Sequence, residues 1–90
     1  MMKMVLNKCY GGFGLSAEAR EVLDVDWLGD VDRTDARLVE MVEDDPEAVA
    51  GSFAKLQVVS LPEETTDYHI DEYDGFETVT YVVDGKLHWA

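Results

Sequence analysis

Two Asp-Gly dipeptides near the C-terminal end constrain the fold more than any other feature of this sequence. Asp74-Gly75 and Asp84-Gly85 lie ten residues apart, each between stretches in which apolar and polar residues alternate. Asp-Gly favours the two-residue turn of a β-hairpin, because both of its residues accept a positive φ. The sequence therefore predicts strands at about 68–73, 76–83 and 86–89 that form an antiparallel meander.

Two further strands are predicted at residues 2–10 and 55–61. In the first, Met2, Met4 and Leu6 occupy every second position, which is typical of a strand with one buried face. The second is largely apolar and ends before Pro62, a residue that cannot donate a hydrogen bond within a sheet. We expect both strands to join the meander in one sheet.

Two amphipathic segments predict helices. The first begins with Ser16 as N-cap and fades near Asp24, and the second begins with Thr34 as N-cap and ends before Pro46, since hydroxyl side chains cap helix starts and proline disfavours helix before it. The expected buried stripes consist of Ala19, Val22, Leu23, Leu38, Met41 and Val42. A proline at the start and a glycine after the end predict one more helical turn at 46–50.

These elements predict the fold class. Ninety residues are enough for one domain, residues 1–90, and too few for two separate cores. We expect a small α+β domain with an antiparallel or mixed sheet of about four or five strands and two helices on one face.

The net charge of −13 excludes several partners. Residues 1–23 hold three bases and two acids, whereas residues 24–90 hold 18 acids and four bases. Such a surface repels nucleic-acid phosphates and anionic lipid headgroups, so neither direct nucleic-acid binding nor membrane binding is expected. It attracts basic surfaces instead. The competing interpretation is that the acidity only keeps the protein soluble or adapts it to a salty cytoplasm.

The sequence also argues against a membrane segment and a bound cofactor. It contains no run of 18 apolar residues, and Met1–Tyr10 is too short and polar for a signal peptide. The single cysteine, Cys9, excludes an internal disulfide and fits a cytoplasmic location. No spacing typical of a metal site, a cofactor or a catalytic motif is present, so we expect no metal, no cofactor and no catalytic residues.

A glycine-rich block is the most site-like motif. It follows the first strand and precedes the first helix, so its backbone N–H groups could face an anion or a nucleotide. The residues that would form this site are Lys8, Gly11, Gly12, Phe13, Gly14 and Ser16. The block matches neither the dinucleotide fingerprint nor the P-loop, and the simpler interpretation is a tight turn that needs glycine for its backbone conformation.

A cluster of aromatic and acidic residues suggests a second kind of site. An aromatic side chain ringed by carboxylates suits a basic partner surface, although most aromatic residues of so small a domain are needed in its core. The residues that would form this partner interface are Trp27, Asp71, Glu72, Tyr73, Asp74, Phe76 and Glu77.

Several blocks of the chain resemble a family of small uncharacterised proteins encoded by tailed phages and prophages. The resemblance rests on the stretch Lys8–Ser16, on Asp32–Asp35 and on Glu72–Glu77, in that order along the chain. The sequence departs from the family at Ala36, where proline is usual, and at its C-terminal end, where the family has a basic stretch before a tryptophan. The resemblance implies a phage product that acts in a bacterial cytoplasm, and it implies no chemistry.

Three functional hypotheses follow. The first is an acidic interaction protein that binds a basic surface on a host protein, for example as a mimic of nucleic acid in counter-defence. The second is a small nucleotide- or anion-binding module that uses the glycine-rich turn. The third is a hydrolase that uses a carboxylate pair, or Cys9 with His69 or His88. In addition, the strand that ends at Trp89 could pair with a second copy to form a homodimer.

Overall fold

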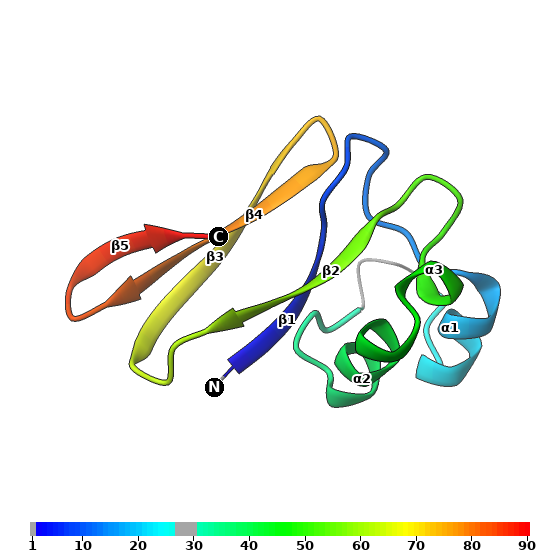
Figure 1. Ribbon diagram of the computed structural model, residues 1–90, viewed down its shortest axis with the longest axis horizontal. Helices are drawn as coiled ribbons and strands as arrows, with labels where there is room; N and C mark the ends of the chain where they lie inside the picture. Colours follow the sequence, from blue (N-terminus) through cyan, green and yellow to red (C-terminus); the bar gives the residue numbers. More distant parts are fainter. Residues whose placement is uncertain (1, 27–30) are drawn as a thin grey trace.

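The computed structural model describes residues 2–26 and 31–90, and Figure 1 shows their arrangement. In chain order the elements are β1 (Met2–Asn7), α1 (Ala17–Leu23), α2 (Ala36–Asp44), α3 (Pro46–Val49), β2 (Leu56–Leu61), β3 (Thr65–Tyr73), β4 (Phe76–Val83) and β5 (Lys86–Trp89). The α+β class is confirmed. None of the described helices combines the length and the apolar character needed to cross a membrane.

The expected single sheet is wrong, because the strands form two sheets. β1 pairs with β2 in a two-stranded antiparallel sheet, and β3, β4 and β5 form a three-stranded antiparallel meander. The β1–β2 sheet lies between the helices and the meander (Figure 1).

The division of the sheet has a physical reason at the second edge of β1. There the Val5 N–H donates to the Arg33 carbonyl over 2.9 Å, and the Asn7 N–H donates to the Glu77 carboxylate over 2.8 Å. Arg33 Nη1 also donates to the Val5 carbonyl. These bonds occupy the groups with which β1 would otherwise pair with another strand.

Both faces of β1 are buried, so this strand is the centre of the molecule. Val5 faces the helices and packs with a cluster that includes Leu38 and Leu56. Met4 and Leu6 face the other way and pack with Leu61 of β2 and Val79 of β4. Neighbouring side chains of a strand point to opposite faces, so one short apolar strand supplies two cores.

The two hairpin turns are confirmed. Asp74 and Gly75 have φ of 53° and 94°, and Asp84 and Gly85 have φ of 52° and 74°. Positive φ at both central residues is the geometry that Asp-Gly favours between twisted antiparallel strands. The strands of the second hairpin, 76–83 and 86–89, have the predicted bounds, whereas the first strand of the meander begins earlier than predicted, at Thr65.

The helix caps are partly as predicted. Ser16 caps α1 by accepting from the Ala19 N–H, and the helix ends at Asp24 in the left-handed conformation. The cap of α2 is Asp35, whose carboxylate accepts from the Arg37 N–H; Thr34 is wrong as the cap because its hydroxyl instead donates to Asp32. Val22 is also wrong as a core residue, since it is exposed.

Candidate functional site

A bidentate ion pair between Arg33 and Glu77 joins the loop before α2 to the three-stranded sheet. Nη1 lies 2.6 Å from Oε1 and Nη2 lies 2.8 Å from Oε2. The side chains are only 20% and 7% exposed, respectively. The Arg33 guanidinium carbon also lies 3.5 Å from the centre of the Phe13 ring, so the cation contacts both a carboxylate and an aromatic ring.

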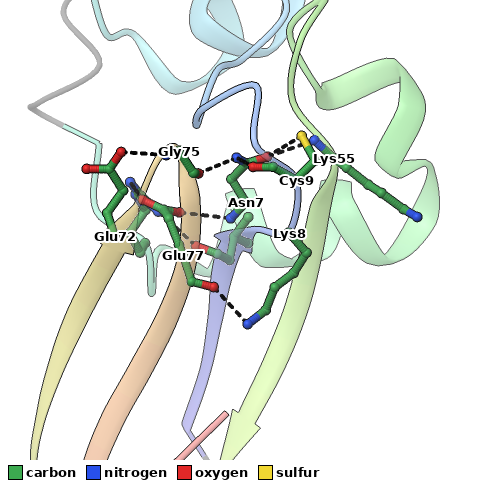
Figure 2. Close-up of polar contacts among 9 residues, drawn as sticks. Asn7, Lys8, Cys9, Lys55, Glu72, Gly75 and Glu77 are labelled. Carbon is green, nitrogen blue, oxygen red and sulfur yellow. Dashed lines mark hydrogen bonds and ion pairs between the residues drawn. The ribbon is translucent and has the colours of Figure 1, made fainter.

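The fully buried Asn7 is the centre of a second set of contacts (Figure 2). Its amide Nδ2 donates to the Cys9 carbonyl over 2.8 Å and to the Gly75 carbonyl over 2.7 Å. Its Oδ1 accepts from the Lys55 N–H over 2.8 Å and from Cys9 Sγ over 3.4 Å. Both donors and both acceptor positions of the amide are therefore used.

Lys8 completes this network from the neighbouring position (Figure 2). Its Nζ donates to the Glu77 carbonyl over 2.8 Å and lies 5.4 Å from the centre of the Phe76 ring. Burial lowers the pKa of Lys8, and the negative charge of Glu77 opposes that shift. At least one of the three ammonium donors is thus used inside the protein.

Three loops meet where the Asn7 amide binds them, and we call residues 8–14, 51–55 and 73–76 together the three-loop end. A Cβ on Gly75 would lie 2.6 Å from the Gly12 nitrogen and 2.7 Å from the Tyr10 oxygen. A Cβ on Gly11 would lie within 2.9 Å of Phe53. Glycine is required here because the backbones approach one another closely. All three loops lie at the same end of the molecule in Figure 1.

The three-loop end displays one exposed aromatic side chain from each loop. Tyr10 is 68% exposed, Phe53 is 78% exposed and Tyr73 is 78% exposed. The Tyr10 ring lies 5.4 Å from that of the half-buried Phe76. Large aromatic groups are usually buried, so three of them on adjoining loops form a surface with the composition of a protein interface.

Acidic side chains lie beside these aromatic groups. Asp71, Glu72 and Asp74 are all exposed on β3 and its turn. Asp71 accepts from the Thr80 hydroxyl over 2.8 Å and lies 3.3 Å from His69 Nε2, and Glu72 accepts from the Gly75 N–H over 2.7 Å. The arrangement offers negative charge next to aromatic surface.

The predicted partner-interface residues divide into three groups. Asp71, Glu72, Tyr73, Asp74 and the half-buried Phe76 lie together at or next to the three-loop end. Glu77 is buried and is paired with Arg33, because alternation along β4 turns it inward with Val79. Trp27 lies outside the described residues.

The predicted anion-site residues lie close together, and several of their polar groups are engaged within the protein. Lys8 donates to Glu77, the Ser16 hydroxyl caps α1, and the Ser16 N–H donates to the Val49 carbonyl. Gly11 packs against Phe53, Phe13 lies against Arg33, and the Gly14 carbonyl accepts from the Gly51 N–H. Gly12 has a φ of 90°, which a tight turn requires.

Four residues of the site were not predicted from the sequence. Asn7 and Arg33 were not singled out, although a polar residue that ends an apolar strand, as Asn7 does, is a usable signal. Tyr10 and Phe53 were not placed on the surface. Their aromatic rings are exposed through loop contacts that no local pattern records.

The carboxylates are not confined to this end. Residues 15–55 hold 12 acids and four bases, and residues 62–90 hold eight acids and one base. Among the described residues, no group of three or more His, Cys, Asp or Glu side chains is arranged to hold a metal ion. What distinguishes the three-loop end is therefore the aromatic surface beside its acids.

Comparisons with models of protein families, with curated proteins and with solved structures found no match for this chain.

Proposed function

We propose that this protein is an acidic interaction module that binds a basic surface of a partner protein through the three-loop end. The observation that carries the proposal is the exposure of Tyr10, Phe53 and Tyr73 on adjoining loops beside Asp71, Glu72 and Asp74. Aromatic groups supply most of the binding energy in many interfaces, and arginine, their frequent counterpart, is attracted both to aromatic faces and to carboxylates.

The contacts beneath the surface support this role. The Asn7 amide bonds to all three loops directly, through the Cys9 carbonyl, the Gly75 carbonyl and the Lys55 N–H. Loops that are already held in one arrangement lose little conformational entropy on binding, so more of the contact energy appears as affinity. The net charge of −13 would also speed the approach of a basic partner at low salt.

The resemblance to phage proteins suggests a more specific form of the proposal. The partner would be a basic host protein in a bacterial cytoplasm, and the acidic module would occupy a channel or groove that normally binds nucleic acid. Counter-defence by mimicry of nucleic acid is one such role. Neither a cofactor nor a metal is part of it. Binding of a nucleotide at the glycine-rich turn stays a prediction, and no contact of the turn favours it.

A salt-titrated pulldown with charge-matched variants tests the proposal. The bait is the protein, and the source of partners is a bacterial lysate. One variant, Asp71→Asn with Asp74→Asn, removes two charges beside the aromatic groups. The control variant, Glu21→Gln with Glu40→Gln, removes two exposed charges from α1 and α2.

We expect capture of a basic protein at low salt and its loss towards about 1 M salt, where the Debye length falls to about 3 Å. The Asp71/Asp74 variant should bind about tenfold more weakly, or about 1.4 kcal/mol, and the control should bind about as well as the unmodified protein. Equal losses in both variants would contradict the proposal, because only diffuse charge would then matter. A partner retained unchanged at about 1 M salt would contradict it as well.

A further inference from the structure

The free edge of β5 carries unpaired backbone groups beside two exposed apolar side chains. Val79 and Ala90 exchange both of their backbone hydrogen bonds, each 2.9 Å long, and the register continues through Tyr81↔His88 and Val83↔Lys86. Bonding alternates along an antiparallel strand. The N–H and C=O groups of Leu87 and Trp89 therefore point away from β4.

No strand in the described part of the chain pairs with this edge of β5, and β5 lies on the side of the sheet remote from the helices (Figure 1). All of its residues are exposed, including the large side chains of Leu87 and Trp89. An edge with free backbone groups and apolar side chains is a template for another strand.

The two edges of the three-stranded sheet differ in how they are protected. The outer strand β3 carries Asp67, Asp71 and Glu72, and its register shifts between Thr65 and Asp67. Acidic side chains and a bulge are the usual devices that prevent pairing at an edge. Residues 85–90 contain no acid and include Lys86. In a chain of net charge −13, this segment is where a second copy meets little like-charge repulsion.

We propose that two copies of this chain pair through their β5 strands, antiparallel and about a two-fold axis at His88. In this register Leu87 of each copy pairs with Trp89 of the other, so that every free N–H and C=O group of those residues is bonded. The Leu87 side chain then lies beside the Trp89 ring of the second copy, a favourable cross-strand pair. The three-stranded sheet becomes continuous across both copies.

The register follows from the geometry of β5. Pairing Leu87 with Leu87 would bring Trp89 opposite Gly85, which has a φ of 74° and is part of the turn. The axis at His88 places the two His88 residues opposite each other at a position without mutual hydrogen bonds, where Cα atoms of antiparallel strands are about 4.5 Å apart. That distance lies within the range of a disulfide.

This inference goes beyond the proposed function and does not depend on it, because β5 is separate from the three-loop end. The dependence on salt concentration distinguishes dimerisation from binding of a basic partner. Association of two acidic copies should strengthen as salt screens their repulsion, whereas binding of a basic partner should weaken. The contact consists of one four-residue strand from each copy, so it buries less surface than the interfaces of stable dimers. We therefore expect a weak dimer that exchanges with monomer.

Cysteine cross-linking in a Cys9→Ser background tests both the dimer and its register. The protein with His88→Cys should form a disulfide-linked dimer under mild oxidation about tenfold faster than the protein with Leu87→Cys, since the two residues at position 87 are diagonal neighbours about 7–8 Å apart. Gln57→Cys, on the exposed side of β2, measures the rate of random collision.

A second change separates pairing from collision. Leu87→Pro removes an N–H that faces the free edge and leaves the bonds to β4 in place. Added to the His88→Cys protein, it should therefore reduce cross-linking to the rate of the Gln57→Cys control. Cross-linking at the same rate in the His88→Cys, Leu87→Cys and Gln57→Cys proteins would overturn the proposal. So would faster cross-linking at position 87 than at position 88.

Discussion

The two halves of the molecule are held by different forces. The helical half (β1, β2 and the helices) has a core of nine buried apolar residues among those described, whereas the core beneath the three-stranded sheet has four. Of those four, only Val79 comes from the sheet itself. The hydrophobic effect thus contributes more to the helical half, and polar contacts from Asn7, Arg33 and Glu77 add to the smaller apolar core in fixing the position of the sheet.

The difference implies that the substitutions which most destabilise the sheet are those at buried polar positions. A buried polar network contributes to stability only while each member keeps its partners, because an unpaired buried group loses its hydration without compensation. Variants of the network should therefore destabilise the protein more than similar changes at exposed polar positions.

The ion pair should give the largest effect. Arg33→Met leaves the Glu77 carboxylate buried without its cation, and we expect the free energy of unfolding to fall by about 4 kcal/mol. The matched control is Arg37→Met, which breaks the exposed ion pair with Asp35 and should change the stability only slightly, because water and salt screen exposed charges. Urea denaturation measures both.

A double variant sharpens this comparison. Arg33→Met with Glu77→Met removes both charges, so it should be more stable than Arg33→Met alone. If Arg33→Met and Arg37→Met proved equally mild, the ion pair would not hold the two halves together.

Loss of the Asn7 amide should rank next. Asn7→Ala leaves the Lys55 N–H and the Gly75 carbonyl without their partner, and we expect a loss of about 3 kcal/mol. Gln57→Ala, at an exposed position of β2, should change the stability by less than about 0.5 kcal/mol. Hydrogen exchange of the amides in residues 51–55 and 73–76 should accelerate only in the Asn7 variant.

Substitution of the two hairpin glycines should lower the stability by unequal amounts. Gly75 and Gly85 both have positive φ, but a Cβ would touch neighbouring backbone only at Gly75. Gly85→Ala should lower the free energy of unfolding by about 1 kcal/mol through backbone strain. Gly75→Ala adds the close contacts and should lower it by about 3 kcal/mol. Equal thermal midpoints would mean that the loops do not meet as described.

A small effect is expected at the cap of α2. Hydrogen bonds from Arg37 hold the pKa of Asp35 below its ordinary value of 3.8. A carboxylate with a lowered pKa stabilises the fold above the pKa of the unfolded chain, and this contribution disappears as pH falls through the folded-state value. Asp35→Ala should therefore cost about 1 kcal/mol near pH 6, and its difference from the unmodified protein should shrink near pH 2. A difference independent of pH would contradict this.

The predictions from sequence succeeded where the cause is local. Asp74-Gly75 and Asp84-Gly85 determine their own turns, and Ser16 caps a helix that starts beside it. Thr34 failed as a cap because Asp35, the next residue, also has an acceptor, and only the path of the chain decides between them.

What could not be predicted depends on residues far apart in the chain. Asn7 binds Gly75, which is 68 positions away, and Arg33 binds Glu77, which is 44 positions away. Further long-range bonds, of Val5 with Arg33 and of the Asn7 N–H with Glu77, close the edge of β1 and divide the sheet. No pattern within one segment predicts any of these contacts. The glycine-rich block and the Asp74-Gly75 turn meet at the three-loop end, a relation visible only after folding.

The proposed function requires that the three-loop end, and not the negative charge as a whole, recognises a basic partner. NMR titration of the isotopically labelled protein with a nine-residue arginine peptide tests this requirement, with a lysine peptide of equal charge as control. We expect shifts concentrated in residues 8–14, 51–55 and 71–76, and tighter binding of the arginine peptide, because guanidinium groups stack on aromatic rings. Shifts spread equally over the acids of α1 and α2, with no preference for arginine, would contradict it.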